Sequence, residues 1–186
     1  HAVELGEKNI KKSFSNCKAL VIGGGAIGLL CALILENVKN CGQIYLSEPN
    51  KRRKDVCSKN LKSNTVSPDD SRLLENSFDI VFDTVGLEIT RKSSIKYVKP
   101  GGTIIHIGLS QPSGDFDFRK TTLQEITFIG TYCYTNKDFE NTLSILSKNK
   151  IGDLDWIEFK DLSKGAEAFK EIHDGTCSAP KIVLIP

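Results

Sequence analysis

The chain has 186 residues, of which 39% are hydrophobic and 26% charged, and its formal net charge is +2. This length is typical of one domain, and this composition is typical of a globular domain with an ordinary core. A net charge this small does not favour nucleic acid or an acidic membrane surface as a partner. The longest apolar run, Ile27 to Leu35, is about half the length that a membrane-spanning helix needs.

The six cysteines occupy positions 17, 31, 41, 57, 133 and 177, and no two of them form a C-x-x-C pair. They lie in or beside predicted strands and helices, so we expect reduced thiols and a cytoplasmic protein. No segment resembles a signal peptide. The chain begins at His1 and contains no methionine, so we expect it to be a piece of a longer protein.

The chain opens on HAVELG, residues 1–6, which predicts the last turn of a helix, and a polar surface connection follows over 7–16. A short apolar strand at 19–22 then leads into the glycine-rich segment GGGAIG. This segment fits G-x-G-x-x-G, and the apolar run after it predicts a buried helix. In such a motif, Gly23 and Gly25 permit a tight turn and the approach of a pyrophosphate, and the third glycine permits close packing of helix and strand.

The same motif can be a glycine turn that serves packing alone. Dinucleotide binding is favoured by an acidic residue about twenty positions further on. Glu48 lies 20 residues after Gly28, directly behind a predicted strand at 43–47. We therefore interpret this part of the chain as a dinucleotide-binding unit with Glu48 at the ribose. The two-residue gap between Gly25 and Gly28 favours a dinucleotide over the adenosyl ligand of a methyltransferase-like fold.

Strands and helices continue to alternate through the middle of the chain. Predicted helices span 51–59, 89–98 and 137–148, and predicted strands span 64–67, 78–86, 103–109 and 126–132. This alternation predicts an α/β fold with a doubly wound (Rossmann) parallel six-stranded sheet and helices on both faces. The run Lys51 to Lys54 reads as a solvated helix face, but Arg53 lies close enough to Glu48 to reach the adenosine end of a cofactor.

In an open parallel sheet the ligand lies outside the carboxyl ends of the strands. We therefore expect Thr84 and Val85 on the cofactor side, together with Ile107 and Leu109. His106 points to the opposite face from its neighbours, and a lone histidine in a strand is more often packed than catalytic. We assign no catalytic residue to this chain.

The last third of the chain is harder to place. Residues 115–118 alternate polar and apolar, which predicts a short strand that could cap the sheet, although a surface loop with two partly buried phenylalanines is the alternative. A strand at 156–159, a helix at 162–173 and a strand at 181–185 have no obvious place in the sheet.

These residues resemble a known family, the zinc-dependent medium-chain alcohol and polyol dehydrogenases. The matching segments follow the family's order and are HAVELG, LVIGGGAIGLL, SEPNKRR, FDIVFDTVG, VKPGGTIIHIGL, ITFIGTYCYT, GAEAF and PKIVLIP. The chain is similar to the sorbitol, threonine and butanediol dehydrogenase branch rather than to the quinone reductases. The resemblance covers only the carboxyl-terminal half of such an enzyme. It implies NAD as the cofactor, because the charge of Glu48 disfavours the 2′-phosphate of NADP.

The resemblance also implies a role for individual positions. The cofactor-binding residues that it implies are Gly23, Gly25, Ala26, Ile27, Gly28, Glu48, Arg53, Thr84, Val85, Ile107, Leu109 and Lys181. Ile27 would back the nicotinamide ring, with Ile107 and Leu109 near it. Lys181 would contact the pyrophosphate, although an exposed lysine before a strand can also be merely solvated. No metal ligand is implied here, because the family's zinc ligands belong to amino-terminal motifs that this chain lacks.

Three segments follow from the resemblance: residues 1–16 as the end of a catalytic-domain helix and a linker, 17–152 as the dinucleotide-binding domain, and 153–186 as a tail that packs with the catalytic domain. It implies a parent enzyme that oxidises a secondary alcohol or polyol, with this chain alone inactive. It also implies a homodimer that meets through the 115–118 region and the sheet edge. The alternative is a stand-alone dinucleotide-binding sensor, which the helix end at HAVELG disfavours.

Overall fold

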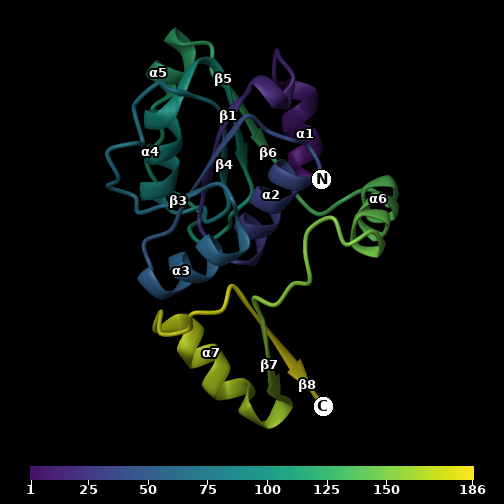
Figure 1. Ribbon diagram of the computed structural model, residues 1–186. Coiled ribbons are helices and arrows are strands. Elements are labelled where there is room, and N and C mark those ends of the chain that lie inside the picture. Colours follow the sequence, from purple (N-terminus) through teal and green to yellow (C-terminus); the bar gives the residue numbers. More distant parts are fainter.

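The computed structural model describes residues 1–186 and is built around a parallel sheet covered by helices on both faces (Figure 1). The strands are β1 (Lys18–Ile22), β2 (Gln43–Ser47), β3 (Asn64–Val66), β4 (Phe78–Asp83), β5 (Val98–His106) and β6 (Thr127–Gly130). The helices are α1 (Ala2–Asn9), α2 (Ala26–Asn37), α3 (Lys51–Asn60), α4 (Glu88–Tyr97), α5 (Phe118–Leu123) and α6 (Asn136–Ser147). The order across the sheet is β3-β2-β1-β4-β5-β6, which confirms the doubly wound six-stranded fold.

Alternate residues of the central strands enter two separate hydrophobic clusters. In β1, Ala19 and Val21 join the cluster that includes the buried face of α2. Leu20 and Ile22 join the cluster on the other face of the sheet, which includes α4. A strand that is buried on both faces has to be apolar throughout. This is why the β1 sequence shows a continuous apolar run instead of an alternating pattern.

The N-terminal segment packs on the sheet more closely than the sequence indicates. In α1, Val3 and Gly6 are buried, and a Cβ added at Gly6 would lie 2.7 Å from Ile80 Cδ1. Phe14, in a short 3-10 turn after the helix, is 2% exposed and belongs to the same cluster as Ala19. The prediction of a polar surface connection over 7–16 is therefore wrong at Phe14, a single apolar residue whose burial anchors the segment.

The segment 115–118 is not a strand. Residues 107–117 form no helix or strand, and Asp117 is the N-cap of α5, with its Oδ1 accepting a hydrogen bond from Lys120 N at 2.7 Å. An aspartate N-cap starts a helix, and four alternating residues are too few to outweigh it. Phe116 is half-buried, with its ring centroid 4.9 Å from that of Phe128 in β6. The alternative prediction, a loop with partly buried phenylalanine, describes Phe116 correctly.

Strand β5 also differs from its predicted bounds. It begins at Val98 rather than Thr103, because the chain stays extended through Pro100 with a register shift against β4. It ends at His106, so Ile107 and Leu109 lie in the loop that follows.

The tail forms a separate unit that adds no strand to the main sheet. β7 (Ile157–Asp161) and β8 (Lys181–Ile185) pair in parallel, and a 3-10 turn (Leu162–Lys164) and α7 (Gly165–His173) connect them. Figure 1 shows this unit on the side of the sheet where α3 lies.

No helix of the chain is both long and apolar enough to span a bilayer. All six cysteines are free thiols, and Cys133 is the exposed one. Burial raises the pKa of Cys31 and of Cys57 to about 12. These thiols therefore stay protonated at neutral pH, as expected of structural cysteines.

A buried carboxylate stabilises the amino-terminal edge of the sheet. Asp79, at the start of β4, is 7% exposed and accepts a hydrogen bond from Lys18 N at 2.7 Å. It forms ion pairs with Lys12, at 2.9 Å, and with Lys99. Burial alone would raise the pKa of Asp79, but these partners, Lys99 foremost, hold it below its ordinary value. Folding therefore stabilises the charged form of this side chain.

We predict that Asp79→Asn lowers the free energy of unfolding by about 2 kcal/mol at pH 7, because buried donors lose a charged acceptor. A lowered folded-state pKa stabilises the fold above the unfolded-state value of about 4, and this contribution disappears as the pH falls through the folded-state value. Urea unfolding at pH 7, 5 and 3 measures the free energy of unfolding of the unmodified chain and of Asp79→Asn. The difference between the two should become smaller as the pH falls. Asp69→Asn, at an exposed position, is the matched control. A difference that is absent at pH 7 or independent of pH contradicts this account.

Candidate dinucleotide-binding site

The glycine loop connects β1 to α2 at the carboxyl end of the sheet. Gly23 has a φ of +101°, which favours glycine, and a Cβ there would lie 2.5 Å from Val85 Cγ2. A Cβ at Gly28 would lie 1.9 Å from Gly23 O, so α2 packs on the turn only because no side chain intervenes. A Cβ at Gly25 would meet nothing within 4 Å. The loop is thus closed toward the protein and open toward solvent, as pyrophosphate binding requires.

Glu48 follows β2 and places its carboxylate against this loop. It is 3% exposed; its Oε2 accepts a hydrogen bond from Gly24 N at 2.7 Å, and its Oε1 accepts one from Asn50 N at 2.8 Å. A carboxylate has about four acceptor positions, so capacity remains for two ribose hydroxyls. Behind the loop, Cys57 Sγ donates to Gly24 O at 3.4 Å. The predicted acid therefore lies beside the predicted glycines.

Arg53, in the first turn of α3, lies beside Glu48 as its spacing predicts. Its Nη1 is 3.8 Å from Glu48 Oε1, and its backbone N donates to Asn50 Oδ1, the N-cap of α3. The guanidinium offsets part of the carboxylate charge without displacing its hydrogen bonds.

The residues that follow β4 have two different positions. Thr84 Oγ1 donates to Ile22 O at 2.8 Å, so Thr84 lies beneath the glycine loop and braces it. Val85 instead lines a cavity of about 370 Å³ together with Gly23, Glu48 and Arg53. Of these two residues, only Val85 therefore lines the cavity beside Glu48.

The far wall of this cavity comes from residues that the sequence analysis did not identify. The start of α4 supplies Leu87, Ile89, Thr90 and Ser93. They follow Gly86, in the turn after β4, and ligands of open parallel sheets bind outside the carboxyl ends of the strands. Position after a strand end was therefore the signal that could have identified them.

The loop after β5 contains the other two predicted residues. Ile107 packs against the hydrophobic core, whereas Leu109 is 79% exposed. Neither residue lines the cavity that contains Glu48.

The tail contacts the site through backbone carbonyl groups. Pro180 O accepts a hydrogen bond from Ala26 N at 3.1 Å, in the first turn of α2. Asn50 Nδ2 donates to Gly175 O at 2.7 Å, and Arg53 Nη2 donates to Cys177 O at 3.4 Å. Lys181 follows Pro180, so its exposed side chain starts close to the glycine loop.

His106 is a packed residue, as the sequence analysis favoured. Its Nδ1 lies 3.2 Å from Asp83 Oδ2, and its ring centroid lies 5.5 Å from that of Phe128. Asp83 is fully buried, and its Oδ1 accepts hydrogen bonds from Val85 N at 3.1 Å and Gly86 N at 2.9 Å. This carboxylate, which the sequence analysis missed, fixes the turn after β4. An acid that ends an apolar strand was the available signal.

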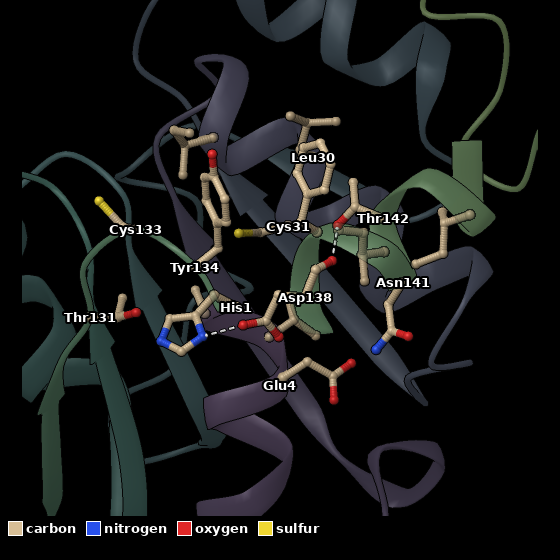
Figure 2. A pocket seen from close by; sticks show the side chains of 16 residues that line it. His1, Glu4, Leu30, Cys31, Thr131, Cys133, Tyr134, Asp138, Asn141 and Thr142 are labelled. Carbon is tan, nitrogen blue, oxygen red and sulfur yellow. Dashed lines mark hydrogen bonds and ion pairs between the residues drawn. The ribbon is translucent and has the colours of Figure 1, made fainter. Parts of the chain in front are cut away.

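A second cavity of about 340 Å³ lies between α1, α2 and α6 (Figure 2). Ile27, which is 51% exposed, lines this cavity and not the one that contains Glu48. Figure 2 shows His1 and Asp138 pointing toward each other, with His1 Nδ1 2.8 Å from Asp138 Oδ2. Asp138 also accepts hydrogen bonds from Thr135 N and Oγ1, which hold its pKa below the ordinary value. Asp138 therefore stabilises the start of α6 through its capping hydrogen bonds with Thr135.

Comparison with known proteins places the chain in a family. Residues 26–148 match the family model described as zinc-binding dehydrogenase. The chain is 31% identical to a probable diacetyl reductase, (R)-acetoin forming, of Saccharomyces cerevisiae over 150 residues, which are 74% of this chain and 35% of that protein. It is 28% identical to the (R,R)-butanediol dehydrogenase of the same yeast, in an alignment that covers 100% of this chain and 51% of the relative.

Solved structures share the fold. The 2R,3R-butanediol dehydrogenase of Bacillus subtilis superposes with a TM-score of 0.81 at 22% identity, over 100% of this chain and 54% of the other. The acetophenone reductase of Geotrichum candidum, solved in complex with NAD, gives a TM-score of 0.82 at 19% identity, over 96% and 50% of the two chains. The chain thus spans about half the length, or less, of these relatives. Since the family model covers most of the chain, from the start of α2 through α6, this protein belongs to the zinc-binding dehydrogenase family.

Proposed function

We propose that this chain is the NAD-binding half of an oxidoreductase that oxidises an alcohol by hydride transfer to a nicotinamide cofactor. The observation that supports this most directly is the open glycine loop beside a buried acid, in which Gly24 N donates to Glu48 Oε2 at 2.7 Å. The loop fits a pyrophosphate, because Gly23 and Gly28 leave no room for side chains on the protein side and Gly25 faces open space. Bound NAD supplies the hydride acceptor, and the chain binds and orients it.

The adenosine end of the cofactor fits the cavity beside Glu48. The carboxylate accepts hydrogen bonds from the ribose hydroxyls, and Arg53 limits the net charge there. Val85 and the start of α4 give the cavity apolar walls, which suit a planar base. The pyrophosphate lies at the first turn of α2, where N–H groups without helical acceptors meet the positive end of the helix dipole.

The nicotinamide end lies on the other side of the glycine loop. Ile27 faces the second cavity and offers an apolar backing for the ring, and Leu109 is exposed beyond the end of β5. Ala26 N, which now donates to Pro180 O, is one of the amides at the pyrophosphate position, and Lys181 is the neighbouring cation. Thr84 contributes indirectly by bracing the loop.

Zinc does not fit any site in this chain. No three His, Cys, Asp or Glu side chains come together in a way that could hold a metal ion. We therefore assign metal binding and proton transfer to a part of the enzyme outside residues 1–186. In this proposal 17–152 is the dinucleotide-binding domain, 1–16 is the end of a catalytic-domain helix and a linker that also packs on the sheet, and 153–186 is a tail that packs with the catalytic domain.

The substrate class rests on the names of relatives. Those names include a butanediol dehydrogenase and probable D-xylulose reductases of Neosartorya and Aspergillus species, the latter at 23–25% identity. We extend this to a secondary alcohol or polyol as the substrate of the whole enzyme. We place the enzyme in the cytoplasm because the six cysteines of this chain are free thiols.

We predict that the chain binds NAD more tightly than NADP, because the 2′-phosphate of NADP would bring negative charge beside Glu48. Glu48→Gln removes the charge at nearly constant size. It should lower the NAD-to-NADP affinity ratio about tenfold, which corresponds to about 1.4 kcal/mol. Calorimetric titration with both cofactors measures the ratio.

Glu75→Gln, at an exposed acid that pairs with Lys96, is the matched control and should leave the ratio unchanged. Tighter binding of NADP by the unmodified chain would show that the cofactor assignment is wrong. If neither NAD nor NADP bound to the chain, the proposed function would be rejected.

We also propose a homodimer that meets at the free edge of β6. β6 pairs only with β5, and a bare sheet edge favours pairing with another strand. Large apolar side chains are exposed beside this edge: Phe118 is 73% exposed and Tyr132 is 80% exposed. Because 115–117 is a loop and Phe118 begins α5, we expect this region to flank the interface while β6 pairs with its own copy across a two-fold axis.

Phe118→Asp should therefore weaken dimerisation by at least about tenfold, because it places a charge in an apolar contact. Phe169→Asp, at an equally exposed phenylalanine on α7, controls for general effects of a surface charge. Sedimentation velocity over a concentration series measures both. A chain that stays monomeric at high concentration, or two variants that behave alike, would remove this interface.

A further inference from the structure

We propose that Arg91 is a positioning residue that fixes the loop after β5 and thereby the nicotinamide side of the site. This inference rests on the proposed function, since it assigns Leu109 in that loop to the cofactor. This segment, the β5–α5 loop, comprises residues 107–117.

Arg91 is a buried cation that forms no ion pair. It lies on α4 and is 8% exposed, and it donates only to backbone carbonyl groups. Its Nη1 reaches Gly86 O at 2.9 Å and Gln111 O at 3.2 Å, and its Nη2 reaches Ser113 O at 2.5 Å. Two acids close to it in sequence or space, Glu88 and Asp115, both pair with Lys92 instead.

A buried charge without a counter-ion is costly, so its presence here calls for a compensating geometric role. The planar guanidinium presents several N–H groups in a fixed fork and can join carbonyl groups from separate segments. In this chain the guanidinium joins Gly86, in the turn after β4, to two residues of the β5–α5 loop. Lysine could not bridge the same three acceptors with comparable geometry.

Further contacts press the loop against the same turn. Gln111 Oε1 accepts a hydrogen bond from Glu88 N at 2.8 Å, at the start of α4. A Cβ added at Gly86 would lie 2.0 Å from Gly108 O, so the two backbones touch. Ser110 N donates to Val85 O at 3.2 Å. Leu109 lies between these ties and is 79% exposed, so its position depends on the loop rather than on packing of its own side chain.

The consequence is a division of labour within one site. The cavity proposed for adenosine is lined by residues of β1, the glycine loop, β2, α3 and α4, and Arg91 does not line it. Loss of Arg91 should therefore disturb contacts with nicotinamide while contacts with adenosine and the pyrophosphate persist. A general structural role would weaken both.

The test compares NADH with ADP-ribose, which lacks the nicotinamide ring, on the 186-residue chain. We expect Arg91→Lys to weaken NADH binding about fivefold to tenfold and ADP-ribose binding less than about twofold. The change in NADH fluorescence on binding should also diminish, because the ring is held less firmly. Arg91→Gln, which removes the buried charge and keeps a side-chain donor, should act in the same direction, so it decides the matter if Arg91→Lys does not fold. Arg72→Lys, at an exposed arginine, is the matched control.

Equal weakening of both ligands, or unchanged binding of both, would overturn the proposal. It would also be overturned if the unmodified chain bound NADH no more tightly than ADP-ribose, because the loop would then not contact the ring. If the chain binds ADP-ribose but the Arg91 variants do not lose more affinity for NADH than for ADP-ribose, the role of Arg91 is rejected and the proposed function stands. Binding of neither ligand rejects both.

Discussion

The structure depends on the contact between the first turn of α2 and the carbonyl of Gly23. Only a residue without a side chain fits at Gly28, because a Cβ would lie 1.9 Å from that oxygen. This contact sets the direction in which α2 leaves β1. Val85 and Thr84 close the turn from the β4 side, where a Cβ at Gly23 would meet them at 2.5 and 2.8 Å. The position of the amino-terminal end of α2 is therefore a consequence of backbone packing.

From this turn, the candidate site extends in two directions. Toward β2 it meets a buried acid that is held by two backbone amides, which is a setting for hydroxyl recognition. Toward β5 it meets exposed apolar residues whose placement depends on loop ties. The tail contacts the glycine turn and the β2 side, because its carbonyl groups accept hydrogen bonds from the start of α2 and from the N-cap of α3. The arrangement fits a long ligand with a polar adenosine ribose at one end and a flat ring at the other.

Periodicity was enough to predict the sheet, because buried parallel strands are short apolar runs between turn residues, and 19–22, 43–47 and 78–83 are clear examples. Residue spacing also brought Glu48 and Arg53 to the glycine loop. Local signals competed at 115–118, where the Asp117 N-cap outweighed a four-residue alternation. The contacts of Asn50 and Arg53 with the tail join residues 125 and 124 positions apart, and no local pattern encodes them. The pair of the buried Asp83 and the partly buried His106 was missed because no local pattern relates residues 23 positions apart.

The central claim is that a dinucleotide binds at the glycine loop of this chain. The most direct measurement is a titration of the isotope-labelled chain with NAD, followed by the backbone amide resonances in two-dimensional NMR. The account predicts saturable shifts of Gly24 to Gly28 and of Glu48, with the amino-terminal edge around Asp79 unchanged. Shifts confined to other surfaces, or no saturable shift at any concentration, would contradict it.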